Sequence, residues 1–449
     1  MPANTSHEAT SLKLDVDSNP EALKETLKRD ALHYHEFPTP GKIGIAITKP
    51  TKTPRDLALA YTPGVAAPVL AIADNPEDAY RFTNKGNLVA VISNGTAILG
   101  LGNLGALASK PVMEGKCVLF KQFAGVNAID IEIETTVPSQ IIETVYQIAP
   151  SFGGINLEDI KAPECFQIEY ELRQRLHIPV FHDDQHGTAV IAAAALLNAL
   201  ELQGKTLEKA HIVVLGAGAA GIAVTQFLVR LGAHRSNIFM LDREGIIHTE
   251  RHGLGPYKFA FARQTDKRTL SEALEGADVL IGVSGPDLMT QDQLKLMADK
   301  PIIFALSNPD PEIHPSLVRE IRPDAIMATG RSDFPNQVNN VLCFPFIFRG
   351  ALDVRARTIS TSMKMAATQA LRELAKQPVP KEVLEAYGVQ SMEFGPEYLI
   401  PKPLDPRLLD WVATAVAAAA IKSNVAKLPY PSHYGEVPFT LNLNGDHHD

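Results

Sequence analysis

Short apolar runs and helix-like segments alternate regularly in the second half of the chain. The apolar runs, which are typical of buried strands, are Ile212 to Leu215, Ile238 to Leu241, Val279 to Ile281 and Ile302 to Ala305. Helical periodicity marks Ala219 to Leu231, Leu270 to Leu274, Phe346 to Ala375 and Leu408 to Ser423. Strands that alternate with helices at this spacing predict a parallel, doubly wound sheet, and the fold class is therefore α/β.

The first half of the chain shows a less regular mixture of patterns. Strands are expected at Lys42 to Thr48, Leu88 to Ser93, Ala97 to Leu99, Cys117 to Phe120 and Ala128 to Glu134. Helices are expected from Pro20 toward His33 and from Ser139 to Ala149. Asn94-Gly95 is typical of a hairpin turn between two strands. These segments predict a separate α/β domain ahead of the doubly wound sheet.

The change of pattern near residue 180 divides the chain. At 449 residues the chain is too long for one compact core, which favours two domains. We expect a flexible extension at 1–30 and an N-terminal substrate and catalytic domain at 31–182. A Rossmann-type dinucleotide-binding domain is expected at 183–425, followed by a tail at 426–449.

Composition and charge exclude several classes of function. The net charge of −9 argues against a nucleic-acid-binding surface. A dianionic substrate would therefore need a local group of Lys or Arg. Thr188 to Leu202, the longest apolar stretch near the middle, is too short to cross a bilayer, and the polar first thirty residues resemble neither a signal nor a transit peptide. Three widely spaced cysteines, Cys117, Cys165 and Cys343, are interpreted as reduced thiols of a cytoplasmic protein.

Two loops match the dinucleotide-binding pattern Gly-x-Gly-x-x-Gly, and their surroundings distinguish them. The loop from Gly100 to Gly105 follows an expected hairpin strand, and Pro111 is expected to cut short any helix after it. This loop is better interpreted as a turn that lines the substrate cleft. The other loop consists of Gly216, Ala217, Gly218, Ala219, Ala220 and Gly221. It follows a buried strand and opens a helix, so it is predicted to bind a dinucleotide pyrophosphate. The alternative is a tight turn that binds no ligand.

An acid at the end of the next strand bears on the choice of cofactor. Asp242 lies 21 residues after Gly221, where a ribose-binding acid belongs. Its carboxylate would accept a hydrogen bond from the 2′-hydroxyl of NAD and repel the 2′-phosphate of NADP. Arg243 is adjacent and suits a phosphate, so the sequence favours NAD only modestly over NADP.

Carboxylates lie in two segments ahead of the second glycine loop. Glu158 and Asp159 lie in Ile-Asn-Leu-Glu-Asp-Ile, and Asp183 and Asp184 lie in Phe-His-Asp-Asp-Gln-His-Gly. Mg²⁺ and Mn²⁺ prefer oxygen ligands. Glu158, Asp159 and Asp184 therefore predict a divalent-cation site, provided that the two segments meet in space. Adjacent acids on a surface loop would otherwise simply be solvated.

A zinc site is the alternative for the second of these segments. His182 and His186 have the i, i+4 spacing of a zinc pair on a helix. However, Ile178 to Phe181 has the pattern of a strand that ends there, which disfavours a helical pair.

Four further residues are candidates for proton transfer and substrate binding. Tyr61 lies in Ala-Tyr-Thr-Pro-Gly-Val-Ala, a rigid turn that would hold a phenol still, although most tyrosines are simply packed. Lys116 is expected at the start of an apolar strand, where it must either reach solvent or face a functional cavity. Near a divalent cation its pKa would fall toward the range of a general base. Asn308 and Asn340 supply amides suited to a carboxylate or carboxamide, or they form turns.

Taken together, these segments resemble malic enzyme, specifically its short bacterial type. The matching stretches are Ala31 to Ile43, Ala60 to Ala66, Ile98 to Gly105, Met113 to Lys116, Phe181 to Ala189, Ser307 to Pro309 and Asn339 to Val341. The resemblance covers roughly residues 30 to 425 and keeps several motifs in the correct order. The chain ends at residue 449, so we expect no phosphotransacetylase-like extension of the kind found in some bacterial members.

The resemblance assigns roles to residues. It implies that Tyr61 is the general acid and Lys116 the general base. It implies that Glu158, Asp159 and Asp184 bind the metal, with Asp183 as a supporting acid. Asn308 and Asn340 match asparagines on the substrate and nicotinamide sides. The family also implies a homodimer or larger assembly.

One position departs from the longer, eukaryotic-type members of the family. Those members carry an arginine that helps to hold a substrate carboxylate, and the corresponding residue here is Ala97. Lys116, Lys121, Arg81 or the asparagines are candidates for that role. The implied activity is oxidative decarboxylation of L-malate to pyruvate and CO2 with NAD or NADP and Mg²⁺ or Mn²⁺. The alternatives are a malolactic enzyme that releases lactate and a non-catalytic nucleotide-sensing protein on the same fold.

Overall fold

A computed structural model describes residues 20–442 of the chain. The described residues up to Ile45 form one unit, and Ala46 begins the second. In the first unit α1 (Pro20–Glu36) confirms the helix expected from Pro20. Of the flexible extension expected at 1–30, residues 1–19 lie outside the described residues, and residues 20–30 belong to α1 rather than to a flexible segment. The strand expected at Lys42 to Thr48 is wrong, because these residues have no partner strand, and Ile45 and Ile47 are 99% and 77% exposed.

A parallel four-stranded sheet occupies the first part of the second unit, with strand order β2-β1-β3-β4. Its strands are β1 (Leu88–Ser93), β2 (Asn127–Glu132), β3 (Gly154–Leu157) and β4 (Val180–His182). The helices of this part are α2 (Pro54–Ala60), α3 (Ala66–Asp74), α4 (Ala79–Phe82), α5 (Ala106–Ala124), α6 (Pro138–Ile148) and α7 (Glu164–Arg175). Alternate residues of β1 face opposite sides: Val89 and Val91 pack with α5, whereas Leu88, Ala90 and Ile92 pack with α6 and α7.

Three local expectations in this region are wrong. Asn94-Gly95 does not start a hairpin, because β1 pairs only with parallel strands and the chain continues through a turn at Leu99–Leu101. Cys117 to Phe120 is part of α5, and Pro111 lies inside that helix rather than ending the helical pattern. Burial explains the helix, since Met113, Cys117 and Phe120 recur at helical spacing and are all buried. The proline therefore costs α5 one backbone hydrogen bond without ending it.

A six-stranded sheet follows in the order β10-β9-β8-β5-β6-β7, parallel except for the β6–β7 pair. Its strands are β5 (Ile212–Leu215), β6 (Ile238–Asp242), β7 (Gly245–Ile246), β8 (Val279–Gly282), β9 (Ile302–Ala305) and β10 (Ile326–Thr329). The helices around it are α8 (Thr188–Gln203), α9 (Ala219–Arg230), α10 (Pro256–Phe259), α11 (Leu270–Leu274), α12 (Gln291–Lys295) and α13 (Pro315–Ile321). Residues of α8 and α9 share one buried cluster with one face of the sheet, and residues of α11, α12 and α13 share another with the opposite face. The doubly wound α/β expectation is confirmed.

The C-terminal helices pack back onto the first sheet's helix α5. The single helix expected from Phe346 to Ala375 is two, α14 (Phe344–Asp353) and α15 (Thr361–Ala375), separated by a loop in which Arg355 has a φ of +46°. The phenyl rings of Phe344 and Phe348 lie 4.8 and 5.3 Å from that of Phe120 on α5. The chain then forms α16 (Lys381–Ala386), a π-helical turn at Leu409–Ala413 and α17 (Thr414–Lys422).

One hydrophobic cluster therefore joins residues from both sides of the boundary expected at 182/183. The proposed domain limits stay predictions. None of the helices in residues 20–442 combines the length and the apolar character needed to cross a membrane.

Candidate active site

The carboxyl ends of β3 and β4 bring four acids together. The two strands are parallel neighbours in which Leu157 pairs with His182, so the residues that follow each strand leave the same edge of the sheet. Glu158 and Asp159 follow β3, and Asp183 and Asp184 follow β4. One carboxylate oxygen from each of Glu158, Asp159 and Asp184 lies within 4.8 Å of the other two. The structure thus brings together the three acids that the sequence proposed as metal ligands.

Backbone and amide donors fix the orientation of these carboxylates. The backbone N–H of Asp159, which has a φ of +52°, donates to Oδ2 of Asp184 at 2.8 Å. The N–H groups of Thr96 and Ala97 donate to the carbonyl of Asp159 at 3.1 and 3.0 Å. Nδ2 of Asn156 donates to Oε2 of Glu158 at 2.9 Å. The turn after β1 therefore holds the acidic group in place rather than starting a hairpin.

The acidic group fits a hard divalent cation. Glu158 and Asp159 are each 4% exposed, and Oδ2 of Asp159 is buried without a hydrogen-bond partner among the described residues. Burial, followed by the charge of Asp184, raises the pKa of Asp159 to about 8, and burial also raises that of Glu158. Buried oxygens that repel one another in this way suit Mg²⁺ or Mn²⁺. Within residues 20–442 no other cluster of acids, histidines or cysteines has this metal-ligand spacing.

The zinc alternative at His182 and His186 is not supported. Nε2 of His186 lies 2.7 Å from Oε1 of Glu169, and its Nδ1 lies 3.4 Å from Nζ of Lys364. His182 is fully buried, and its Nδ1 lies 3.7 Å from Oδ2 of Asp184. The two imidazoles therefore have different neighbours and do not share a ligand position.

Lys116 lies between two of the acids, on α5 rather than on the expected strand. Its Nζ is 2.7 Å from Oδ2 of Asp183 and 2.9 Å from Oε1 of Glu158, and it lies 4.2 Å above the ring of Phe344. Burial alone would lower the pKa of Lys116, but Asp183 and Glu158 outweigh it and raise the pKa above its ordinary value. The sequence left open whether Lys116 reaches solvent or faces a functional cavity, and the structure places its ammonium between Asp183 and Glu158.

Asn340 completes the group around Asp183. Its Nδ2 donates to Oδ2 of Asp183 at 3.1 Å, and its Oδ1 accepts from the hydroxyl of Thr188 at 3.2 Å. Two of the other candidates for carboxylate binding are engaged elsewhere. Arg81 pairs with Asp78, and Nζ of Lys121 donates to Asn127. Lys116 and Asn340 are the candidates that the structure places at the acids.

Asn308 lies against the first glycine loop. It follows β9, and its carbonyl oxygen would be only 1.9 Å from a Cβ at position 100, so this close approach requires Gly100. The Gly100–Gly105 loop thus packs against a residue that the sequence proposed for the site, and its interpretation as a turn that lines the substrate cleft stays a prediction. The loop also leads into α5, which carries Lys116.

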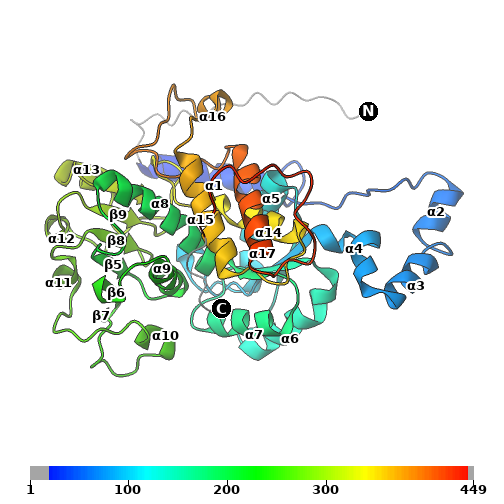
Figure 1. Ribbon diagram of the computed structural model, residues 1–449, viewed down its shortest axis with the longest axis horizontal. Helices are drawn as coiled ribbons and strands as arrows, with labels where there is room; N and C mark the ends of the chain where they lie inside the picture. The colour runs from blue at the N-terminus through cyan, green and yellow to red at the C-terminus, as the bar shows by residue number, and fades with distance from the viewer. Residues whose placement is uncertain (1–19, 443–449) are drawn as a thin grey trace. The chain divides into compact units, whose positions relative to one another are not determined.

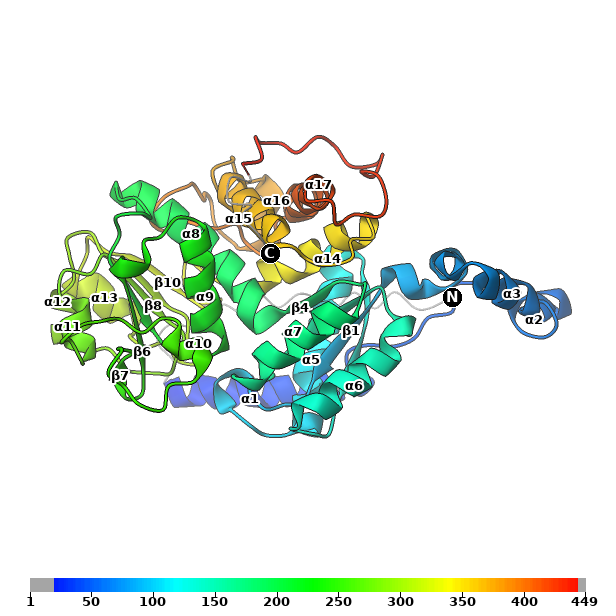
Figure 2. The same ribbon diagram turned by 60° about the horizontal axis from the view of Figure 1, so that its bottom comes forward.

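Tyr61 is not brought to this group within the chain. It directly follows α2, and its side chain is 75% exposed. Figures 1 and 2 both show α2 and α3 at the periphery, apart from α5 and the four-stranded sheet.

The second glycine loop has the geometry of a dinucleotide-binding turn. Gly216 has a φ of +124°, and a Cβ on Gly221 would lie 1.8 Å from the carbonyl oxygen of Gly216. A Cβ on Gly218 would meet nothing within 4 Å, so this position leaves space for a pyrophosphate to approach the backbone. Ala219 then begins α9.

Asp242 ends β6, as predicted, but it is already paired. Its carboxylate accepts from Arg251 at 2.8 and 3.0 Å and from Nζ of Lys258 at 2.6 Å. Burial would raise the pKa of Asp242, yet these two cations lower it to about 2. Arg243 is adjacent in sequence. The sequence reasoning missed Arg251, in a loop 9 residues further on, and Lys258, in the short helix α10 16 residues further on, because neither segment has a periodic pattern that points to Asp242.

Two buried groups near the acids were also missed. Asn156, which orients Glu158, is fully buried in β3, and a lone amide within the apolar run Gly-Ile-Asn-Leu was the signal available. Glu169 is 6% exposed and binds His186. No pattern in the sequence connects Glu169 with His186.

The acidic group predicts that stability in the absence of metal falls as pH rises. The pKa of Asp159 is about 8 in the folded protein against an ordinary value of 3.8. Between these values the folded state binds more protons than the unfolded chain. Its free energy of unfolding therefore decreases with rising pH, by about 1.4 kcal/mol per pH unit for each proton.

Urea unfolding at several pH values within this window, in EDTA and in Mn²⁺, measures the effect. We expect the stabilisation by Mn²⁺ to grow as pH rises, because the ligands must lose protons to bind it. The Asp159→Asn protein should lose much of both dependences. Equal stabilisation by Mn²⁺ at all pH values would contradict the prediction.

Two family models match consecutive parts of the chain, and both describe malic enzyme. The family model described as "Malic enzyme, N-terminal domain" matches residues 40–173, and "Malic enzyme, NAD binding domain" matches residues 185–384. The NADP-dependent malic enzyme of Halomonas elongata is 63% identical over 412 residues, which cover 92% of this chain and 98% of that protein.

Two further similarities concern length and structure. The NADP-dependent malic enzyme of Escherichia coli strain K12 is 58% identical over 91% of this chain, but the match covers only 54% of that longer protein. The crystal structure of malic enzyme from Pyrococcus horikoshii superposes with a TM-score of 0.81 and 43% identity, covering 90% of this chain and 92% of that one.

Proposed function

Because this chain belongs to the malic enzyme family, we propose that it catalyses the oxidative decarboxylation of L-malate to pyruvate and CO2 with reduction of NAD or NADP. The observation that carries this proposal is the position of Lys116 between Glu158 and Asp183. A proton-accepting side chain thus lies directly beside the group of acids that fits a divalent cation.

Glu158, Asp159 and Asp184 would hold the cation, and the Gly216–Gly221 loop would hold the dinucleotide. When bound, the nicotinamide accepts a hydride, and the divalent cation acts as a Lewis acid toward a carbonyl oxygen. Both groups are needed because malate must lose a hydride from C2 before the bond to its departing carboxylate weakens.

Lys116 takes the proton from the C2 hydroxyl as the hydride leaves. The paired carboxylates keep Lys116 protonated, so it must release a proton before it acts as a base. If Glu158 held the cation, Asp183 would be the only one of the two carboxylates still paired with Lys116, and the loss of one partner would favour that release. Asn340, held by Thr188, fixes Asp183 and with it the direction of the lysine. Loss of CO2 then gives an enol, and a proton donor at C3 completes pyruvate.

We propose that Tyr61 is this proton donor and that it acts in the site of a second copy of the chain. Within one chain α2 lies apart from α5, the helix that carries Lys116 (Figures 1 and 2). No residue of α2 or α3 is buried, and Leu57, Leu59, Val69 and Leu70 are each more than half exposed. Apolar helices exposed to this degree are typical of an oligomer interface. A symmetric dimer built on α2 and α3 would carry Tyr61 toward the partner.

The surroundings of Asp242 favour NADP as the cofactor. Two cations neutralise its carboxylate, and Arg243 adds a third positive charge. The repulsion of a 2′-phosphate that the sequence suggested is thereby offset. Lys258, whose side chain is 38% exposed, is the best placed to bind that phosphate.

Replacing Lys258 by alanine should therefore raise KM for NADP by about tenfold or more, since a charge-assisted hydrogen bond contributes about 1.5–3 kcal/mol. KM for NAD should change little, because NAD carries no 2′-phosphate. Steady-state kinetics with both cofactors measure the difference. Lys295→Ala on α12 is the matched control, since its ammonium pairs only with the exposed Asp292. An equal rise in KM for NAD and for NADP in the Lys258→Ala protein would refute the proposed preference for NADP.

Product analysis separates this proposal from the malolactic alternative. A malic enzyme forms pyruvate and one reduced cofactor for each malate, whereas a malolactic enzyme forms lactate and no net reduced cofactor. A nucleotide-sensing protein would consume no malate. We expect pyruvate, and lactate as the main product would overturn the proposal.

The three free, buried thiols agree with a reducing, cytoplasmic setting.

A further inference from the structure

A basic cavity of about 570 Å³ lies beside the turn that carries Asp183 and Asp184, and His186 of that turn lines it. One face of α9, the end of α7, the loop after α14 and the first turn of α15 form its walls, and these helices can be followed in Figure 2. Its volume lies in the range of cavities that hold a small metabolite. The mechanism proposed above does not use this cavity.

The charges of the cavity walls are of one sign. Arg173, Arg230, Arg357 and Lys364 line it, and none of the described residues that line it is an aspartate or glutamate. No ion pair with a described residue involves the guanidinium of Arg173, Arg230 or Arg357. The whole chain carries a net charge of −9, so the three unpaired guanidinium groups form a positive patch on a protein whose net charge is negative.

We propose that this cavity binds a small multivalent organic anion, of the sugar-phosphate or polycarboxylate kind, and that occupancy regulates the enzyme. Guanidinium groups bind phosphate and carboxylate oxygens in a bidentate manner, so three of them around one cavity match several anionic groups on one ligand. Phe227 and the aliphatic part of the wall lie beside them and would contact the carbon skeleton. This inference goes beyond the proposed function, because it concerns a second ligand.

A connection to the catalytic acids is built into one short element. His186 lines the cavity and lies in the π-helical turn Asp183–Gly187, which also carries Asp183 and Asp184. Lys364 reaches from the cavity wall to Nδ1 of His186 at 3.4 Å. An anion that draws Lys364 toward itself would weaken the contact of Lys364 with His186. This contact is made to the turn that also carries Asp184, one of the proposed metal ligands. We therefore expect the affinity of the acidic group for the divalent cation to change when an anion occupies the cavity.

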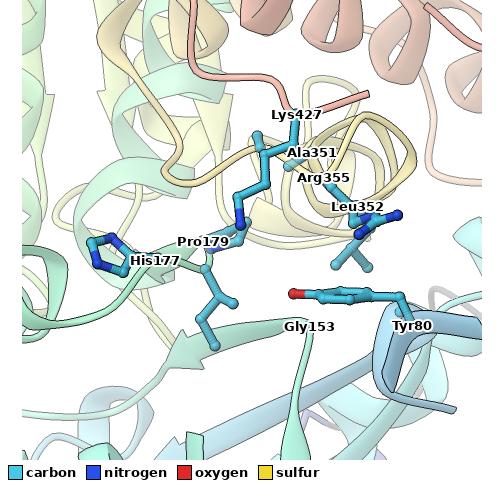
Figure 3. Close-up of a pocket in the computed structure, with 11 residues that line it drawn as sticks. Tyr80, Gly153, His177, Pro179, Ala351, Leu352, Arg355 and Lys427 are labelled. Carbon is cyan, nitrogen blue, oxygen red and sulfur yellow. The ribbon is translucent and has the colours of Figure 1, made fainter. Parts of the chain in front are cut away.

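A second cavity in the same region lacks these properties. It is lined by Tyr80, Arg355 and Lys427, among others, and holds only about 10 Å³ (Figure 3). Its two cations are already engaged, because Arg355 and Lys427 share the carboxylate of Glu77. The guanidinium of Arg355 also stacks over the ring of Tyr80 at 4.4 Å. Room for about one water and paired charges leave no place for an anionic metabolite there.

Calorimetric titration of the enzyme with saturating NADP present tests the proposal, because the bound cofactor blocks its own phosphate sites. The probes are fructose 1,6-bisphosphate for the phosphate class and propane-1,2,3-tricarboxylate for the carboxylate class. We expect saturable binding of at least one probe. The double variant Arg230→Gln/Arg357→Gln, which removes two exposed and unpaired charges, should weaken it by about tenfold or more. Arg319→Gln is the matched control, since its exposed pair with Glu397 lies outside this cavity, and it should bind as the wild type does.

Three outcomes decide the proposal. Absence of saturable binding by either probe up to about 10 mM would overturn it, as would equal binding by wild type and double variant. The regulatory part requires that the bound probe change KM for Mn²⁺ by about twofold or more in the wild type and not in the double variant. Unchanged kinetics with a bound probe would overturn that part. The titration needs no turnover, so its result is independent of whether the chain oxidises malate.

Discussion

Replacing Lys116 by alanine should lower kcat by about a hundredfold to ten-thousandfold, the range that a general base contributes. The ammonium of Lys116 is the nearest cation to both Glu158 and Asp183, and no other lysine or arginine of the described chain pairs with either acid. The substitution therefore removes the group that accepts the hydroxyl proton without supplying a substitute. Steady-state and single-turnover measurements of reduced cofactor with L-malate and Mn²⁺ measure the loss.

Lys121→Ala is the control for this experiment. Lys121 lies on the same helix, but its Nζ donates to Asn127 at the surface, so its loss should leave kcat almost unchanged. Lys116→Arg keeps the charge and the ion pairs but is a poor base near neutral pH, and it should fold normally and remain nearly inactive. A Lys116→Ala protein with ordinary turnover would end the assignment of Lys116.

Mixed oligomers of two inactive variants should regain activity. Tyr61→Phe removes the proposed proton donor and Lys116→Ala removes the proposed base. In a dimer with one copy of each, and with Tyr61 acting in the partner's site, one site has both groups intact. Each mixed dimer has one intact site out of two, so about half of the wild-type activity per dimer is expected once the mixed dimers are isolated. Co-expression with two affinity tags, followed by assay of the doubly purified protein, measures it.

The control is a mixed oligomer of Lys116→Ala with Lys116→Arg, which has no intact site in either arrangement and should stay inactive. If Tyr61 acted within its own chain, the first mixture would also stay inactive, because each site would lack one group. That result would refute the exchange of Tyr61 between copies. Size measurements on the purified mixture would show that mixed oligomers had formed.

Elements with strong local signals could be predicted from the sequence. The apolar run Ile212 to Leu215, the glycine loop and the helix from Ala219 lie within some twenty consecutive residues, and all three occur as expected. The local sequence is sufficient here because a strand that is buried on both faces forms a continuous apolar run, and because close contacts in the turn require the glycines. Asp242 was placed at the end of β6 for the same reason.

Segments whose structure depends on distant contacts could not be predicted in this way. Cys117 to Phe120 is apolar enough for a strand, and its helical state follows from contacts with α14, more than two hundred residues away. Asn94-Gly95 has a hairpin signal, yet its neighbours Thr96 and Ala97 bind the backbone of Asp159 instead. Long-range packing overrides local turn preference at both places.

The candidate site shows the same division between local and distant information. The residue types were identifiable, because acids and a lysine within apolar surroundings are unusual. Their partners were not, since Lys116 meets Asp183 across 67 residues and Asn340 meets it across 157. The two cations on Asp242, which offset the expected repulsion of a 2′-phosphate, come from a loop and from the short helix α10, and neither segment has a clear periodic pattern.

The most direct test of the central claim is the rate of cofactor reduction with L-malate, Mn²⁺ and NADP, followed by ultraviolet absorbance, and its response to EDTA. The account predicts rapid reduction, one pyruvate for each reduced cofactor, and loss of the reaction when EDTA removes the metal. The same protein carrying Asp184→Asn should need far more Mn²⁺ to reach its maximal rate. Reduction of the cofactor that persists unchanged in EDTA, or no reduction at all with intact and folded protein, would contradict a metal-dependent malic enzyme site built from these acids.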